Sequence, residues 1–219
     1  MVALSDNWIE PLSTISSHHT GEGIVIDIGT GDGRFVYQSA RRNPKKFYIG
    51  IDPNTRPLKQ ISEKIYRKPN KGGAPNVLFV QSAIEDLPEE FNGVADEVHI
   101  HFPWGSLLRA VATGDLPVLE KLRLICAPGA LLEIVIGIDD ERDRTEIARL
   151  GLTPLSRDFV SNVLTARYGA AGFEIVEQGT LTASEWSSFE TSWAKRLQGN
   201  ERRSVTYLIG RASESAASS

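Results

Sequence analysis

An acidic, glycine-rich turn is the part of the sequence best suited to chemistry. It reads Asp27-Ile28-Gly29-Thr30-Gly31-Asp32-Gly33 and continues the apolar run 24–28. A turn between a strand and a helix lies in the crevice where open α/β sheets bind ligands, and glycines there allow positive φ and close backbone approach. The aspartates would repel a pyrophosphate but suit S-adenosylmethionine (SAM), which has a cationic amine and a sulfonium. We predict that Asp27, Gly29, Gly31 and Asp32 contact SAM; the alternatives are a dinucleotide site or a simple turn with capping aspartates.

Two later segments are positioned to complete this cofactor site. Asp52 and Pro53 follow the apolar run 47–51, and we expect the Asp52 carboxylate to accept hydrogen bonds from both ribose hydroxyls of SAM. Residues 82–88 follow the run 77–80, where an adenine ring would lie. Ala83 and Ile84 are expected to form an apolar wall there, with Glu85 or Asp86 beside it. A helix N-terminus rich in acidic residues would explain the same segment.

A proline-containing aromatic motif, His101-Phe102-Pro103-Trp104-Gly105, follows the run 97–102. A nucleic-acid base that leaves its stack is commonly held against an aromatic face, and Pro103 fixes φ so that its neighbours point into the crevice. We predict that Phe102, Pro103 and Trp104 receive the target base, although such a motif elsewhere would be core packing. Of His99 and His101, we expect one to be a satisfied inward histidine and the other to lie at the surface.

Basic residues gather in two places although the net charge is −4. The first group comprises Lys59, Lys64, Arg67, Lys68 and Lys71, and the second comprises Lys195, Arg196, Arg202 and Arg203. The spacing of residues 64, 67, 68 and 71 places them on one side of a helix for as far as that helix persists. Two basic clusters near aromatic residues favour an RNA-binding surface over two solvated helix faces.

Short β-branched runs alternate with helical patterns, which is typical of an α/β fold with a mostly parallel sheet. Strands are expected at 24–28, 47–51, 77–80, 97–102, 131–138, 173–178 and 205–210, and helices at 33–42, 56–68, 116–126 and 157–171. The last two strands should form an antiparallel pair at one sheet edge. We therefore predict a Rossmann-like class I SAM-dependent methyltransferase domain with a seven-stranded sheet, helices on both faces, and insertions after strand five and between strands six and seven.

Length and composition agree with one domain. We assign residues 1–211 to it, with 1–20 as an N-terminal appendage and 212–219 as a disordered tail. The single cysteine, Cys126, excludes an intrachain disulfide and suits a reducing cytoplasm. The N-terminus lacks the layout of a secretory signal, and no apolar run approaches the roughly 20 residues that span a bilayer. We expect a cytoplasmic monomer without a membrane segment or a bound metal.

The chain resembles the aminoglycoside-resistance 16S rRNA methyltransferases that modify N1 of adenine 1408 in the decoding site. The resemblance runs from Ile26 to Ile209. Its landmarks are residues 27–34, Phe47–Pro53, Lys68–Gly73, Phe102-Pro103-Trp104-Gly105 and Ser192-Trp193-Ala194-Lys195-Arg196-Leu197. The first alone would indicate only a methyltransferase, whereas the last two in this order and spacing are much more specific.

The resemblance implies a role for each matching residue. Asp27, Gly29 and Asp52 would contact SAM, with Ala83 and Glu85 near its adenine. Trp104 and Trp193 would hold the flipped target adenine between them. The rRNA phosphates of the 30S subunit would be contacted by Lys64, Arg67, Lys68, Arg196 and Arg203, together with Lys71 of the same cluster. Glu63 and Glu201 are acidic where relatives can be basic, which bears on the strength of 30S docking more than on the reaction.

The nucleophile suggests the mechanism. Adenine N1 has an in-plane lone pair, so no general base is expected, and alignment of N1, methyl carbon and sulfur would supply the catalysis. The nearest alternative is a tRNA (guanine-N7)-methyltransferase, which usually has an Asp between the proline and the tryptophan that this chain lacks. A small-molecule methyltransferase would need neither basic cluster. A SAM-binding RNA-binding protein without turnover is the alternative outside the enzymes, and a methyl-transfer assay separates it.

Overall fold

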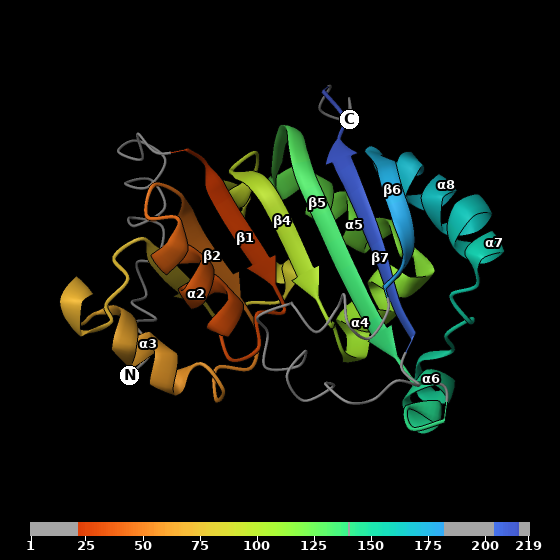
Figure 1. Cartoon of the computed structure of the whole chain (residues 1–219). Coiled ribbons are helices and arrows are strands. Elements are labelled where there is room, and N and C mark those ends of the chain that lie inside the picture. Colours follow the sequence, from red (N-terminus) through yellow and green to blue (C-terminus); the bar gives the residue numbers. More distant parts are fainter. Residues whose placement is uncertain (1–21, 140, 182–203, 215–219) are drawn as a thin grey trace.

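A seven-stranded sheet with the order β3-β2-β1-β4-β5-β7-β6 forms the centre of the computed structural model, which describes residues 22–139, 141–181 and 204–214 (Figure 1). The strands are β1 (Ile24–Ile28), β2 (Phe47–Ile51), β3 (Val77–Val80), β4 (Ala95–His101), β5 (Cys126–Ile138), β6 (Phe173–Leu181) and β7 (Ser204–Ala212). β1 to β5 pair in parallel, whereas β7 is antiparallel to both β5 and β6. The sheet is therefore mixed, and the expected antiparallel pair lies at its edge.

Helices cover both faces of this sheet. They are α2 (Arg34–Arg42), α3 (Lys59–Ile65), α4 (Gly105–Thr113), α5 (Leu116–Ile125), α6 (Arg144–Leu150), α7 (Arg157–Phe159) and α8 (Thr165–Ala170), with a π-helical turn η4 (Val160–Leu164) between the last two. Short 3-10 turns are η1 (Pro69–Lys71), η2 (Ile84–Asp86) and η3 (Glu89–Phe91). Among the described residues, no helix is long and apolar enough to cross a membrane.

The two faces of the strands belong to different cores. In β1, Ile24, Ile26 and Ile28 pack in the main core with buried residues of α4, α5 and α8, whereas Val25 packs with residues of α2 and α3. Successive side chains of a strand point to opposite faces. Asp27 therefore shares the α2 face with Val25, and this face carries most of the polar groups described below.

The structure corrects several predicted boundaries. The predicted helix 56–68 is shorter, because the N–H of Ala74 donates to the carbonyl of Ile65 at 2.9 Å and turns the chain back after α3. Helix α4 was not predicted, and β5 begins five residues earlier than expected, at Cys126 rather than Leu131. β7 continues through Ala212, which is buried, rather than ending at Gly210 as expected. The insertion between β6 and β7 lies outside the described residues.

Candidate functional site

The glycine turn after β1 is held by hydrogen bonds to the neighbouring strand. The N–H groups of Gly29 and Thr30 both donate to the carbonyl of Ile51, at 2.8 and 3.1 Å. Gly31 has a φ of 59°, and a Cβ added there would meet no atom of the described residues within 4 Å. Since Gly31 lines the cleft described below, a side chain at this position would extend into the cleft. Glycine at this position therefore leaves space in the cleft for a ligand beside the turn.

Two acidic residues are fixed around this turn. Asp52 accepts hydrogen bonds from the N–H of Gly31 through Oδ2 at 2.9 Å and from the N–H of Asn54 through Oδ1 at 2.8 Å. Burial raises the pKa of Asp52, and these two hydrogen bonds oppose the rise. Asp32 accepts from the N–H of Arg34 at 3.2 Å and pairs with its guanidinium at 3.5 Å. Asp52 is therefore tied to the turn itself, whereas Asp32 is balanced by a neighbouring cation.

A strained junction between β4 and α4 presents Trp104. Phe102 has a φ of 50° and is the only non-glycine residue in the described ranges with a positive φ, a conformation that costs about 1–3 kcal/mol. Its side chain is buried, and its N–H donates to the carbonyl of Val135 at 2.7 Å. Trp104 precedes the first residue of α4 and is 43% exposed. The junction thus buries one aromatic ring and leaves the next at the surface.

One cleft of about 420 Å³ brings the glycine turn and the aromatic motif together. Its lining comprises Gly29, Gly31, Asp32, Asp52, Pro53, Asn54, Pro57, Phe102, Pro103, Trp104, Ser106 and Leu107. Asn54, Pro57, Ser106 and Leu107 were not singled out from the sequence. Ser106 and Leu107 lie in the first turn of α4, and recognising a helix after Trp104 would have been the signal for them. The cleft has acids and glycines from β1 and β2 on one side, and aromatic and apolar groups from the β4–α4 junction on the other.

Four predicted cofactor residues lie apart from this lining. Asp27 is 3% exposed and sits beneath the glycine turn. Ile84 is buried in the main core, so its side chain supports η2 from inside rather than forming an open wall. Ala83 is half-buried and Glu85 is exposed, both at the start of η2 after β3.

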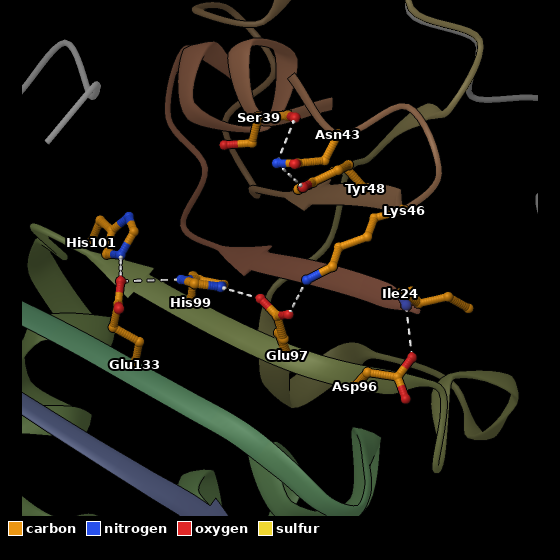
Figure 2. Close-up of polar contacts among 10 residues, drawn as sticks. All are labelled: Ile24, Ser39, Asn43, Lys46, Tyr48, Asp96, Glu97, His99, His101 and Glu133. Atoms are coloured by element: carbon orange, nitrogen blue, oxygen red, sulfur yellow. Dashed lines mark hydrogen bonds and ion pairs between the residues drawn. The ribbon is translucent and has the colours of Figure 1, made fainter. Parts of the chain in front are cut away.

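Hydrogen bonds link five side chains on the α2 face of the sheet (Figure 2). Lys46 Nζ binds Glu97 Oε1, Glu97 Oε2 lies 3.3 Å from His99 Nε2, and His99 Nδ1 lies 3.2 Å from Glu133 Oε1. The same oxygen of Glu133 is 2.6 Å from His101 Nε2. Both histidines are buried, so the expectation that one lies at the surface was wrong. The physical reason is that residues i and i+2 of a strand point to the same face.

The hydrogen bonds in this network shift the pKa of its members. Burial opposes the charged form of His99, but hydrogen bonds with Glu133 and Glu97 outweigh it and raise the pKa of His99 to about 9. The hydrogen bond from His99 is the main cause that lowers the pKa of Glu97 to about 2. Burial would raise the pKa of Glu133, but hydrogen bonds from His101 and His99 hold it well below its usual range. His99 is therefore an imidazolium between two carboxylates at neutral pH.

The first basic cluster does not form a single helical face. α3 ends at Ile65, so Arg67, Lys68 and Lys71 lie in the following loop and in η1, where all three are exposed. This corrects the prediction of a shared helical side. Of residues 64, 67, 68 and 71, only Lys64 lies within α3. Its ammonium lies 4.5 Å from the ring centre of Tyr37.

Hydrogen bonds fix the loop that carries these basic residues. The Tyr37 hydroxyl donates to the carbonyl of Gly72 at 2.8 Å, and the N–H of Gly73 donates to the carbonyl of Lys68 at 3.1 Å. A Cβ at Gly73 would lie 1.7 Å from the carbonyl oxygen of Arg67, so this position requires glycine. The loop presents its cations in a defined arrangement. Trp193, Arg196 and Arg203 lie outside the described residues.

Comparisons with known proteins connect these features to one family. The family described as 16S rRNA (adenine(1408)-N(1))-methyltransferase matches residues 9–212. An Escherichia coli protein of the same description is 39% identical over 192 residues, which cover 87% of this chain and 88% of that protein. The crystal structure of the aminoglycoside resistance methyltransferase NpmB1 is 44% identical, with a TM-score of 0.80 over 92% of this chain and 93% of that one.

A further solved structure was determined with the cosubstrate. It is a point mutant of the 16S rRNA (adenine(1408)-N(1))-methyltransferase from Catenulisporales acidiphilia with cosubstrate SAM. It is 34% identical to this chain, with a TM-score of 0.82, and the match covers 96% of this chain and 94% of that one. The likeness therefore extends over nearly the whole of both chains.

Proposed function

This chain belongs to the 16S rRNA (adenine(1408)-N(1))-methyltransferase family, and on that premise we propose that it transfers the methyl group of SAM to N1 of adenine 1408. The observation that carries the proposal is the single cleft in which the glycine turn, Asp52 and Trp104 lie together. The product would carry a methylated, cationic N1 that cannot accept a hydrogen bond from an aminoglycoside. The proposed consequence for the cell is aminoglycoside resistance.

The chemistry of the cofactor side of the cleft fits SAM. Gly31 leaves space that any Cβ would enter, and Asp52 offers a fixed carboxylate at the end of β2, which suits ribose hydroxyls. Asp32 and the buried Asp27 supply negative charge for a cationic amine. Gly29 and Pro53 would contact the ligand through their backbone, with Ala83, Glu85 and the backbone of Ile84 toward its adenine. SAM, when bound, supplies an electrophilic methyl group on a sulfonium.

The aromatic side of the cleft would hold the target base. The exposed indole of Trp104 offers a stacking face, and base–aromatic contacts are worth about 1–3 kcal/mol. Phe102 and Pro103 set the direction of Trp104 through the kink after β4. In the proposal Trp193 supplies the second aromatic wall. A methylated adenine is a cation, so the same indole faces also stabilise the product by about 0.5–2 kcal/mol each.

No residue of the chain is assigned a role as general base. Adenine N1 carries an in-plane lone pair and needs no deprotonation before it attacks the methyl group. His99 and His101 are buried and hydrogen-bonded to Glu133, so their position does not suit proton transfer from a base in the cleft. The residues of the chain therefore act by binding, orienting and excluding water.

The proposed substrate is 16S rRNA within the assembled 30S subunit, bound by a monomer in the cytoplasm. Arg67, Lys68 and Lys71 are exposed on a fixed loop, with Lys64 beside them, and Arg196 and Arg203 belong to the second basic cluster of the sequence. Lysine and arginine that neutralise phosphates release counterions, so binding should weaken steeply with salt. The two clusters are far apart in sequence, which suits a folded ribosomal surface better than a short RNA.

Incubation with purified 30S subunits and tritiated SAM, followed by mapping of the methylated nucleotide, tests the proposal. We expect a single product at N1 of adenine 1408, with weak activity on naked 16S rRNA. Modification of a guanine N7 in tRNA would instead favour the tRNA methyltransferase alternative. Tight SAM binding without methylation of 30S subunits, 16S rRNA or tRNA would favour the non-catalytic alternative.

A further inference from the structure

Three side chains form a row across neighbouring strands beneath the glycine turn. Asp27 of β1 is paired in register with His99 of β4, which is in turn paired with Glu133 of β5. Neighbouring strands lie about 4.8 Å apart, and here the side chains at the paired positions point to the same face. Asp27 and His99 are 3% and 8% exposed. An imidazole thus lies between two carboxylates, and one of these belongs to the cofactor turn.

His101 extends this row toward the cleft. It follows His99 by two residues on the same face, and the centres of the two imidazole rings are 5.3 Å apart. The ring of Phe35, from α2, lies over both histidines, with centre distances of 5.2 Å to His99 and 4.6 Å to His101. The histidines are therefore enclosed between the sheet and α2, on the side of the sheet where Asp27 points.

His99, His101 and Glu133 also have the composition of a metal site, since one ligand atom from each lies within 4.8 Å of the others. In a tetrahedral zinc site with bonds of about 2.0–2.1 Å, neighbouring ligand atoms are roughly 3.3 Å apart. The 2.6 Å between Glu133 Oε1 and His101 Nε2 is instead the distance of a direct hydrogen bond. Both nitrogens of His99 already face carboxylates. The distances favour a network of ions and hydrogen bonds over a metal centre.

Charges of opposite sign alternate through this network. Lys46 faces Glu97, Glu97 faces His99, and His99 faces Glu133. The pKa of Asp27 is raised, mainly by burial and slightly by Asp52 at the end of β2, while the charge of His101, the side chain of Thr30 and the charge of His99 act to lower it. A buried carboxylate is costly unless a positive charge or hydrogen bond compensates it. His99, whose two carboxylate partners favour its charged form, faces Asp27 from β4, and His101 lies beside it.

We propose that His99 and His101 are positioning residues of the cofactor site, which hold Asp27 as a carboxylate beneath the glycine turn so that it can attract the ammonium group of SAM. Glu133 and Glu97 keep His99 charged, and Lys46 compensates Glu97 at the outer end of the network. The inference rests on the proposed function only in its last step, the contact of Asp27 with SAM. The electrostatic coupling between Asp27 and the histidines belongs to the protein alone.

Carbon-13 NMR titration of the Asp27 carboxyl in the protein without SAM tests the coupling. The signal is assigned with Asp27→Asn, and the titration is repeated in His99→Gln and His101→Gln, which keep hydrogen-bonding groups without a positive charge. Loss of an adjacent opposite charge should raise the Asp27 midpoint by about 1–3 pH units. Tyr168→Phe is the matched control, because it removes the buried hydrogen bond from Tyr168 to Val111 in the main core. Its Asp27 midpoint should equal that of the wild type.

Calorimetric SAM affinity between pH 6 and 8 tests the last step. A raised Asp27 midpoint means that, as pH falls, the carboxylate is protonated at a higher pH than in the wild type. The histidine variants should therefore lose affinity about tenfold for each pH unit below the new midpoint, whereas the wild type and Tyr168→Phe should stay nearly constant over this range. If His99→Gln does not fold, Glu133→Gln should shift the Asp27 midpoint in the same direction, because it removes a carboxylate that keeps His99 charged.

Several outcomes would overturn the inference. An Asp27 midpoint that does not move in His99→Gln, His101→Gln or Glu133→Gln would reduce the network to a structural role. Stoichiometric zinc binding that is lost in His99→Gln would replace it with a metal site. A shifted Asp27 midpoint in a protein that fails to bind SAM at any pH would leave the coupling intact and contradict the proposed function instead.

Discussion

The two sides of the cleft are held in place by different means. On the cofactor side, the turn after β1 donates two hydrogen bonds to the carbonyl of Ile51, and Asp52 accepts a third from Gly31. On the other side, Trp104 is 43% exposed and follows the strained Phe102. The first side is a network of backbone and carboxylate contacts between neighbouring strands, whereas the second is an aromatic side chain directed by one backbone kink.

This difference matches what each side would bind. A small cofactor that occupies the same place in every turnover benefits from groups that are already fixed, because little reorganisation accompanies binding. A base that arrives as part of a large folded RNA is recognised through a broad stacking face, which tolerates small errors of approach. We therefore expect substitutions on the first side to act on SAM affinity and those on the second to act on turnover.

The largest effect is expected from Gly31→Leu. The side chain would enter the cleft, so SAM affinity measured by calorimetry should fall about a hundredfold or more, which corresponds to about 2.7 kcal/mol. Gly93→Leu is the matched control, because Gly93 also has a positive φ and open space around it but lies outside the cleft. Both variants should share the backbone strain of about 1–2 kcal/mol. Equal SAM affinity in the two variants would contradict the assignment of the glycine turn to the SAM site.

Trp104→Ala should have the next largest effect and act on turnover alone. Loss of about 1–3 kcal/mol of stacking predicts a decrease in kcat of about ten- to a hundredfold, with SAM affinity and melting temperature unchanged. Trp104→Phe keeps an aromatic face and should have intermediate activity. Leu124→Ala, which removes another exposed apolar side chain outside the cleft lining, should have wild-type turnover.

Trp193, the proposed second aromatic wall, allows a test of whether the two tryptophans act at the same place. Because loss of one wall already frees the base, Trp193→Ala combined with Trp104→Ala should be little worse than the poorer single variant. Fully additive losses would mean that the two residues act at different places. A Trp193→Ala protein that melts normally and retains full drug resistance would remove Trp193 from the site.

Lys68→Glu should have a smaller effect, confined to docking. Affinity for 30S subunits should fall, and the slope of log affinity against log salt should decrease by about one, while SAM affinity stays the same. Lys121→Glu makes the same charge change at an exposed position of α5 and should leave 30S affinity unaltered. Arg203→Glu is expected to behave like Lys68→Glu. Equal losses in Lys68→Glu and Lys121→Glu would indicate a general charge effect rather than a docking surface.

The smallest effect on methyl transfer is expected from the network around His99, which acts instead on the pH dependence of stability. The pKa of His99 is raised to about 9 in the folded protein from 6.5, so its stabilising contribution is complete below pH 6.5 and is lost as pH rises through 9. The free energy of unfolding in urea should fall by about 3 kcal/mol across this window. Glu97, with a folded pKa of about 2, contributes stability above pH 4.5 that is lost as pH falls toward 2. His99→Gln should remove the decline at high pH, and a decline of the same size in that variant would rule out His99 as its cause.

The sequence alone determined β1, β2 and β3 to the residue, together with the glycine turn and the aromatic motif that line the cleft. These features are local. Buried parallel strands are continuous β-branched runs that glycine, proline or aspartate ends, and the positive φ values of a tight turn favour glycine. The resemblance to the family also depended on motifs that can be read along the chain.

Only the tertiary structure decided which distant residues meet. The end of α3 depends on a return of the chain in which Ala74 donates to the carbonyl of Ile65, so the four basic residues do not share a helix face. The row of Asp27, His99 and Glu133 depends on the register of three strands that lie far apart in the sequence. Strand periodicity could have placed both histidines on one face. The partners of the two histidines could not be predicted from strand periodicity, because pairing across strands is set by the packing of the whole sheet.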